Sequence, residues 1–197
     1  MPGAKGVSSE PSLLESAVPL LHAHFGTPLL VAAQIVTLPG QVVVSFLLVA
    51  AASVVLHRRG RTEAAVAWVA ALVLASAIEV ATKSALERPP LYRHGAHIVA
   101  FDSSWPSGHA ARSPIVAAVL ALAWPRLRVA LAIWLVASIA LLELPGVHTP
   151  SDLAGGLLLA ALLGVVALDA QRSGVLRRGV LARLGSAARP RAAPPGP

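Results

Sequence analysis

The sequence predicts an all-α fold, a polytopic bundle of transmembrane helices, on three observations. Of the 197 residues, 56% are hydrophobic and only 13% are charged, a combination that is rare in soluble domains. The apolar residues form long blocks instead of amphipathic stripes, and a helix needs roughly 20 such residues to cross about 30 Å of hydrocarbon. The connections between the blocks are short, as is typical of a compact bundle in a bilayer.

Five blocks dominated by Ala, Leu and Val are predicted to span the membrane: residues 41–56, 63–83, 108–124, 129–144 and 152–168. Upstream of them, residues 12–37 are also apolar but contain Glu15, two histidines and two prolines. This N-terminal segment forms either a sixth span that ends at Leu38-Pro39-Gly40 or a helix that lies in the membrane interface.

The basic residues predict the orientation of these spans. Arginines lie in the connection 57–61, in the connection 125–128 and between residues 172 and 191. If the helices alternate, all three clusters lie on one side, and the positive-inside rule makes that side cytoplasmic. The net charge of +7 therefore indicates topology in the plasma (cytoplasmic) membrane and weak contact with anionic membrane lipids, and it does not indicate binding of nucleic acid.

Composition also predicts the domain organisation. We expect a flexible N-terminus at residues 1–11, one membrane domain at residues 12–172, and a basic cytoplasmic tail rich in Pro, Ala and Arg at residues 173–197. The N-terminus has no small-residue cleavage site, so no signal peptide is expected to be removed. Cysteine is absent, which excludes disulfides and thiolate metal sites, and no metal or other cofactor is expected. Nothing in the sequence indicates an oligomeric state.

Lys83 and Arg88 lie at the outer end of the second predicted span, where the positive-inside rule does not call for cations. One interpretation is that both side chains snorkel to the interface, with Glu79 pairing to Lys83 at i,i+4. The other is that they bind an anion.

The stretch Pro106-Ser107-Gly108-His109 opens the third span. Ser107 suits a helix cap, Gly108 lets a ligand approach the backbone, and a helix N-terminus attracts anions. His109 can exchange a proton near neutral pH. The alternative is a simple cap beside an interfacial histidine.

His148 and Asp152 precede and open the fifth span. Asp152 can close a capping box with Thr149 as the N-cap. Alternatively, Asp152 holds the imidazole of His148 in one tautomer and raises its nucleophilicity, as a carboxylate does in other nucleophilic sites. Helix alternation brings all three stretches to the extracytoplasmic side. Together they predict phosphoryl transfer without metal, in which His148 attacks phosphorus and His109 protonates the leaving oxygen.

These stretches resemble the motifs of the type 2 phosphatidic acid phosphatase superfamily of integral membrane lipid phosphatases, which are Lys-x6-Arg-Pro, Pro-Ser-Gly-His and Ser-Arg-x5-His-x3-Asp. The second motif matches completely, Lys83 matches the start of the first, and His148 and Asp152 match the end of the third. The resemblance implies a phosphohistidine on His148, acid catalysis by His109, and phosphate held by Lys83, Ser107 and Gly108. The implied substrate is a lipid phosphate or diphosphate, such as a polyprenyl diphosphate or a phosphatidate-like lipid.

Both arginines of the family motifs are missing in register, because Pro90-Leu91 and Leu141-Leu142 occupy their positions. Arg88, Arg93 and Arg112 are candidates to replace them. One such contact to the transition state is typically worth about 3 kcal/mol, or on the order of 10² in rate. The alternative function is therefore a catalytically weak or inactive homologue that binds phosphorylated lipid. Vanadate-dependent haloperoxidases share the motif architecture, but the membrane spans and the missing arginines disfavour that chemistry.

Overall fold

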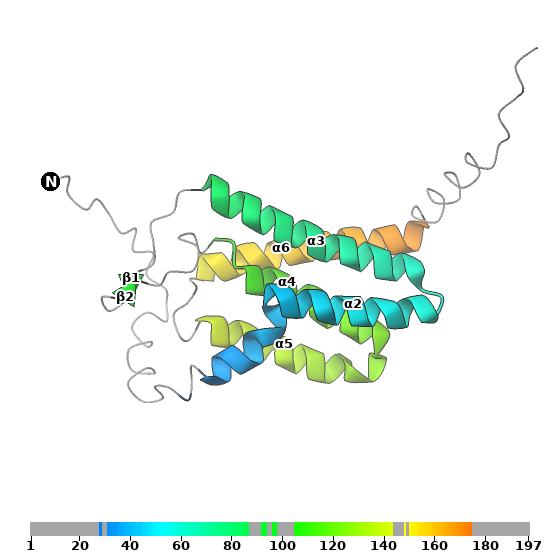
Figure 1. Ribbon diagram of the computed structural model, residues 1–197, viewed down its shortest axis with the longest axis horizontal. Helices are drawn as coiled ribbons and strands as arrows, with labels where there is room; N and C mark the ends of the chain where they lie inside the picture. The colour runs from blue at the N-terminus through cyan, green and yellow to red at the C-terminus, as the bar shows by residue number, and fades with distance from the viewer. Residues whose placement is uncertain are drawn as a thin grey trace, which may run out of the picture.

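The computed structural model describes Pro28, residues 31–86, 105–143, His148 and 150–174, and the backbone of two short strands. The α-helices are α2 (Val42–Arg58), α3 (Thr62–Ala85), α4 (Gly108–Ala123), α5 (Arg128–Glu143) and α6 (Pro150–Ser173). Two 3-10 helices, η1 (Leu38–Gly40) and η2 (Pro125–Leu127), precede α2 and α5, and the strands β1 (Tyr92–Arg93) and β2 (Ala96–His97) pair antiparallel. The described fold is thus a helical bundle, as predicted (Figure 1).

All five predicted spans coincide with helices, but their lengths differ. Three described helices are long and apolar enough to cross a membrane: Thr62–Ala85, Pro125–Leu142 and Pro150–Ser173. A fourth qualifies if Val31–Gly40 and Val42–Arg58, which meet at 49°, form one bent span. With 16 residues, α4 is about 24 Å long and shorter than a hydrocarbon core of about 30 Å. The structure therefore confirms a helical fold with three or four candidate membrane spans among the described residues, and it does not confirm the number of five or six spans.

The N-terminal apolar segment is described from residue 31 onward, apart from Pro28. Residues 31–37 are helical and lead into η1, so this helix ends at Leu38-Pro39-Gly40 as expected. The indole N–H of Trp134 in α5 donates to the carbonyl of Val36 at 2.8 Å, which fixes the segment against the bundle. The rest of residues 12–37, the predicted flexible N-terminus and residues 175–197 of the predicted tail lie outside the described residues.

The helices alternate in direction, so their connections gather at two ends of the bundle (Figure 1). The turn between α2 and α3, the 3-10 helix η2 and the end of α6 lie at one end. The first two carry basic clusters that are expected on one side, and the end of α6 carries Arg172, the one arginine of the third cluster within the described residues. Arg59 and Arg61 donate to the carbonyls of Ala123 and Leu122 at the end of α4, where cations satisfy unpaired helix carbonyls. The end of α3 and the beginnings of α4 and α6 lie at the other end.

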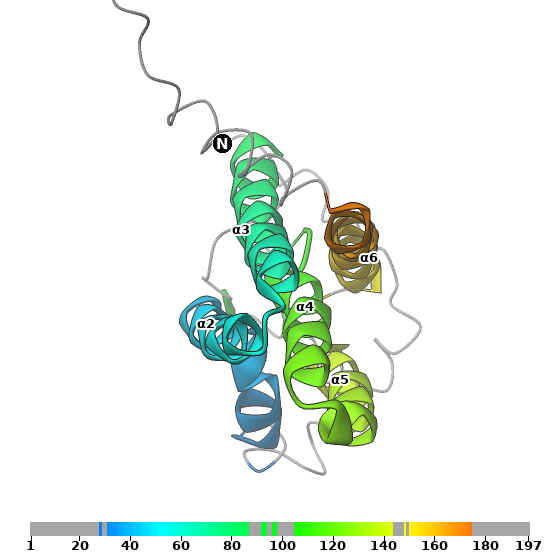
Figure 2. The same cartoon turned by 90° about the vertical axis from the view of Figure 1, so that its right-hand side faces the viewer.

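The short helix α4 is the centre of the bundle, and it contacts α2, α3, α5 and α6 (Figure 2). Ten of its 16 residues are buried, and most of them are small. Small residues let helix backbones approach closely, which is how membrane helices gain packing energy without a hydrophobic driving force. Many large apolar side chains on the other helices point outward, for example Val43, Val129 and Leu158, each at least 70% exposed. Such an apolar exterior suits lipid as the surrounding solvent.

Candidate active site

Ser107 caps α4, as its position in the sequence predicts. Its backbone is extended (φ −65°, ψ 117°), and its Oγ accepts a hydrogen bond from the amide of Ala110 at 3.3 Å. The side chain is completely buried. The amides of Gly108 and His109 belong to the first turn, whose N–H groups have no acceptor within a helix, so this terminus suits an anion.

The beginning of α6 is tied directly to this cap. The amide N–H of Ser107 donates to the carbonyl oxygen of Asp152 at 2.9 Å, although the two residues are 45 positions apart. A Cβ on Gly156 would collide with the carbonyl oxygen of Ser107 and would lie 3.0 Å from the amide nitrogen of Ala111. The missing side chain therefore allows α6 to approach the first turn of α4, and this contact brings the Pro-Ser-Gly-His and His-x3-Asp stretches together.

His148 and Asp152 face one another as the sequence analysis expects. The Asp152 side chain is completely buried, and its Oδ2 lies 3.9 Å from Nδ1 of His148. That separation is within ion-pair range but longer than a hydrogen bond. Within the described part of the chain, the buried Nδ1 of His148 has no hydrogen-bond partner. Thr149, the alternative cap, lies outside the described residues.

His109 is the residue at which the three stretches meet. Its imidazole is half-buried, and the charges of Lys83, His148, Glu79 and Arg112 all act on it. A fourth element, η1, also reaches it, because a Cβ on Gly40 would lie 3.0 Å from Cδ2 of His109. The histidine thus lies between the end of α3, the start of α6 and the turn before α2.

Glu79 also belongs to this cluster, although its position in the sequence predicts only a pair with Lys83. That pair is confirmed, with 2.8 Å between Lys83 Nζ and Glu79 Oε1. In addition, Arg112 Nη1 donates to Glu79 Oε2, and a Cβ on Gly108 would collide with the same carboxylate. The Glu79 carboxylate therefore contacts Lys83, Arg112 and Gly108, which are three of the groups predicted to bind phosphate. In this structure the Glu79 carboxylate occupies the space beside the backbone of Gly108 that was predicted for a ligand.

Arg112 connects three elements through its guanidinium group. It is 4% exposed, its Nε donates to the carbonyl of Gly40 at 2.9 Å, and its Nη1 donates to Glu79. These contacts join α4 to η1 and to α3 and keep a buried cation beside the predicted phosphate site. Its predicted role as a phosphate ligand stays a prediction.

A comparison with protein-family models matches the PAP2 superfamily over residues 64–173, which is more than half of the chain and runs from α3 through α6. The chain belongs to the PAP2 superfamily. The matched range contains Lys83, the Pro-Ser-Gly-His stretch, His148 and Asp152. Membership and the apolar helices make the chain a membrane protein of a phosphatase family. No curated protein and no solved structure was found to match it.

This PAP2 protein has apolar packing where the family's third motif has an arginine. Leu142 is 6% exposed and belongs to a small cluster with Ala110 and Leu153. These two neighbours directly follow His109 and Asp152 in the sequence, so Leu142 packs beside the site instead of contributing a charge to it. Arg88, predicted to bind substrate, lies outside the described residues, and so does the side chain of Arg93.

Proposed function

We propose that this PAP2 protein hydrolyses a lipid phosphate or diphosphate through a phosphohistidine intermediate on His148, without a metal ion. The observation that carries the proposal is the hydrogen bond between Ser107 and Asp152, because it joins the acid–base motif to the nucleophile motif. The ionisable side chains of Lys83 and His148 near His109 support the same grouping.

The ring nitrogens of His148 have different tasks in this mechanism. Since Nδ1 faces Asp152, Nδ1 carries the proton and Nε2 is the nucleophile. Nε2 attacks phosphorus, the bond between phosphorus and the lipid oxygen breaks, and His109 gives its proton to that oxygen. A water molecule then attacks the phosphohistidine while His109 takes its proton, and phosphate leaves. Lys83 and the first amides of α4 stabilise the negative charge on the phosphoryl oxygens.

The position of the site supports a lipid substrate. The end of α3 and the starts of α4 and α6 form one end of an apolar bundle, so a headgroup at the membrane surface reaches His148 while its chains stay in the bilayer (Figure 1). The basic clusters lie at the opposite end, which favours an extracytoplasmic site in the plasma membrane. A polyprenyl diphosphate or a phosphatidate-like lipid meets these conditions.

The experiment is a measurement of phosphate release by the purified protein in detergent, with chelator present, across phosphatidate and polyprenyl mono- and diphosphates. Release from at least one lipid is expected. The second candidate function is binding of phosphorylated lipid without turnover, which is favoured by Leu142 in place of an arginine and by Glu79 at the predicted phosphate site. That function predicts lipid phosphate retained through purification and no release over hours.

A substitution of Glu79 tests whether phosphate enters where the carboxylate now lies. Phosphate must compete with Glu79 for Lys83 and Arg112, so Glu79→Gln should bind vanadate, a phosphate analogue, about tenfold more tightly, since removing one like charge is worth on the order of 1.4 kcal/mol. The measurement is inhibition of turnover by vanadate, or vanadate binding by calorimetry. Glu63→Gln, at the other end of α3, is the matched control. Weaker vanadate binding by Glu79→Gln would mean that Glu79 holds the two cations in place for phosphate.

A further inference from the structure

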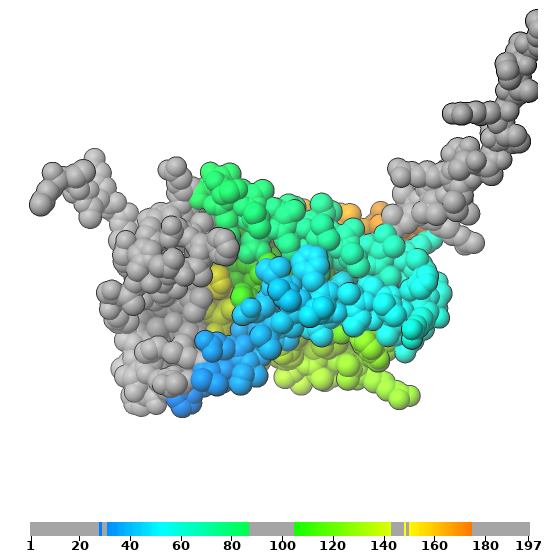
Figure 3. All heavy atoms as spheres, viewed as in Figure 1, coloured from blue at the N-terminus to red at the C-terminus, as the bar shows by residue number. Residues whose placement is uncertain are grey.

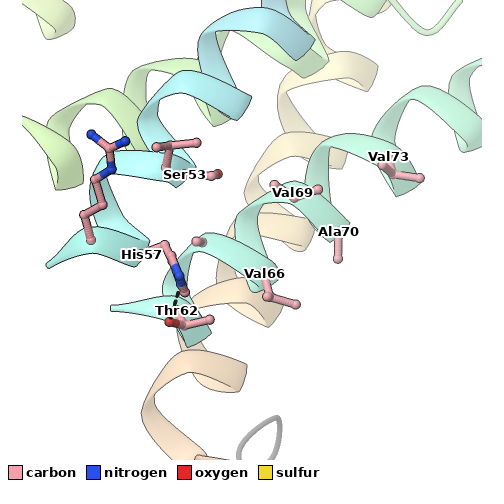
Figure 4. Close-up of a pocket in the computed structure, with 10 residues that line it drawn as sticks. Ser53, His57, Thr62, Val66, Val69, Ala70 and Val73 are labelled. Carbon is pink, nitrogen blue, oxygen red and sulfur yellow. Dashed lines mark hydrogen bonds between the residues drawn. The ribbon is translucent and has the colours of Figure 1, made fainter. Parts of the chain in front are cut away.

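A hollow of about 570 Å³ opens on the surface between α2 and α3, at the basic end of the bundle. One part of its lining is apolar and comes mainly from α3. The other part is polar and lies where α2 ends and α3 begins (Figure 4). The apolar lining residues are Val54, Ala65, Val66, Val69, Ala70 and Val73, and the polar ones are Ser53, His57, Arg58 and Thr62.

The polar end offers groups that bind an anion. His57 Nδ1 lies 2.9 Å from the hydroxyl of Thr62, which holds the ring at the rim (Figure 4). Arg58 is exposed beside them, and none of the ten lining residues is acidic.

The three arginines of this turn are not equivalent. Arg59 and Arg61 donate to carbonyl groups at the end of α4, so both guanidinium groups already bind acceptors within the protein. The side chain of Arg58 makes no hydrogen bond or ion pair within the described residues. It is therefore the arginine of the turn that is available to an external anion, and it lines the hollow.

The apolar part has the dimensions of one lipid chain in one leaflet. From Thr62 to Val73, α3 rises about 16 Å, roughly half of a hydrocarbon core of about 30 Å. Its valines are open to the surroundings, with Val66 49% and Val73 46% exposed. Figure 3 shows α2 and α3 side by side on the same face of the molecule. A chain lying along them would cover apolar surface, with its headgroup level with the basic turn.

We propose that this hollow is a binding site for one anionic phospholipid of the surrounding bilayer. Its phosphate contacts Arg58, and one acyl chain lies along Val66, Val69 and Val73. Basic pockets between membrane helices bind acidic headgroups for this reason. Along α3, Lys83 lies 21 residues beyond Thr62, about 30 Å from the headgroup end of the hollow, and 10 residues beyond Val73, about 15 Å from its apolar end. The site is therefore separate from the catalytic end and does not rest on the proposed hydrolysis.

The test compares lipid binding by wild-type protein and two variants, measured by native mass spectrometry after exchange into nanodiscs that mix phosphatidylglycerol and phosphatidylcholine. Wild type should retain one phosphatidylglycerol in preference to phosphatidylcholine. Arg58→Gln should reduce that preference about tenfold, because a charge-assisted contact to the headgroup is lost. Ala70→Phe should displace the lipid by filling the apolar part without any change of charge.

Matched controls separate this site from general attraction to acidic lipid. Arg126→Gln removes the same charge at the same end of the bundle, outside the hollow, and Ala130→Phe adds the same ring to an exposed position of α5. Neither control should change the retained lipid. Equal retention of both lipids by wild type, or an equal loss in Arg126→Gln, would overturn the proposal. A dimer that excludes lipid from the wild-type protein would assign the hollow to a second copy of the chain instead.

Discussion

The His148→Ala protein is expected to release phosphate from its lipid substrate at least about 10³-fold more slowly than wild type, because loss of a nucleophile leaves only binding and charge stabilisation. The fold should be unaffected, since the His148 side chain makes no hydrogen bond within the described residues and its charge partner Asp152 keeps its backbone contact to Ser107. The measurement is the rate of phosphate release at saturating substrate, together with the thermal unfolding temperature in detergent.

Covalent labelling sharpens this experiment. Wild type quenched during turnover of a radiolabelled lipid phosphate should carry an acid-labile, base-stable label, and His148→Ala should carry none. Unchanged release by His148→Ala would discard the covalent mechanism and leave membership of the superfamily untouched. Absence of release from wild type as well would favour the binding function instead.

The Gly156→Ala protein is expected to lose about 10² in turnover and about 2 kcal/mol in free energy of unfolding. The added methyl group would meet the carbonyl of Ser107, the Cβ of Ala110 at 2.8 Å and the amide nitrogen of Ala111 at 3.0 Å. Two of these three atoms are backbone, so they cannot turn away, and overpacking of this kind costs about 1–3 kcal/mol. The beginnings of α4 and α6 must then separate, and misplacement of catalytic groups by about 1 Å can cost on the order of 10² in rate.

Gly164→Ala is the matched control, eight residues further along the same helix. A Cβ there would lie 3.7 Å from the ring of Trp68, which is an ordinary contact. Because alanine favours a helix more than glycine does, this variant should be as stable as wild type or more stable, with unchanged turnover. Equal behaviour of the two variants in kinetics and thermal unfolding would show that the close contact between α4 and α6 does not position the site.

The positions of the helices could be predicted because backbone groups in hydrocarbon must pair within a helix, and long apolar blocks mark where that happens. The number of spans could not, because α4 is surrounded by other helices and does not have to match the membrane thickness with its 16 residues. An apolar block in a sequence does not distinguish a helix that faces lipid from one that is enclosed by protein.

In the candidate site, local chemistry predicted the Ser107 cap and the pair of Glu79 and Lys83, since both depend on residues three or four positions apart. The contact of Arg112 with Gly40 joins residues 72 positions apart, and no local sequence pattern predicts it. The same holds for the place of the Glu79 carboxylate against Gly108, which depends on how closely α3 packs on α4.

By itself, the sequence determined a helical membrane protein with its phosphatase motifs at one end of the bundle. The order of the residues fixes the pattern of hydropathy and charge, and that pattern predicts the helices and their direction. Only the tertiary structure decided which side chains at that end of the bundle contact one another. Glycines at positions 40, 108 and 156 allow separate segments to approach within van der Waals distance, so a carboxylate from α3 lies among the predicted phosphate ligands. Such contacts arise from the packing of complete helices, which residue order alone does not specify.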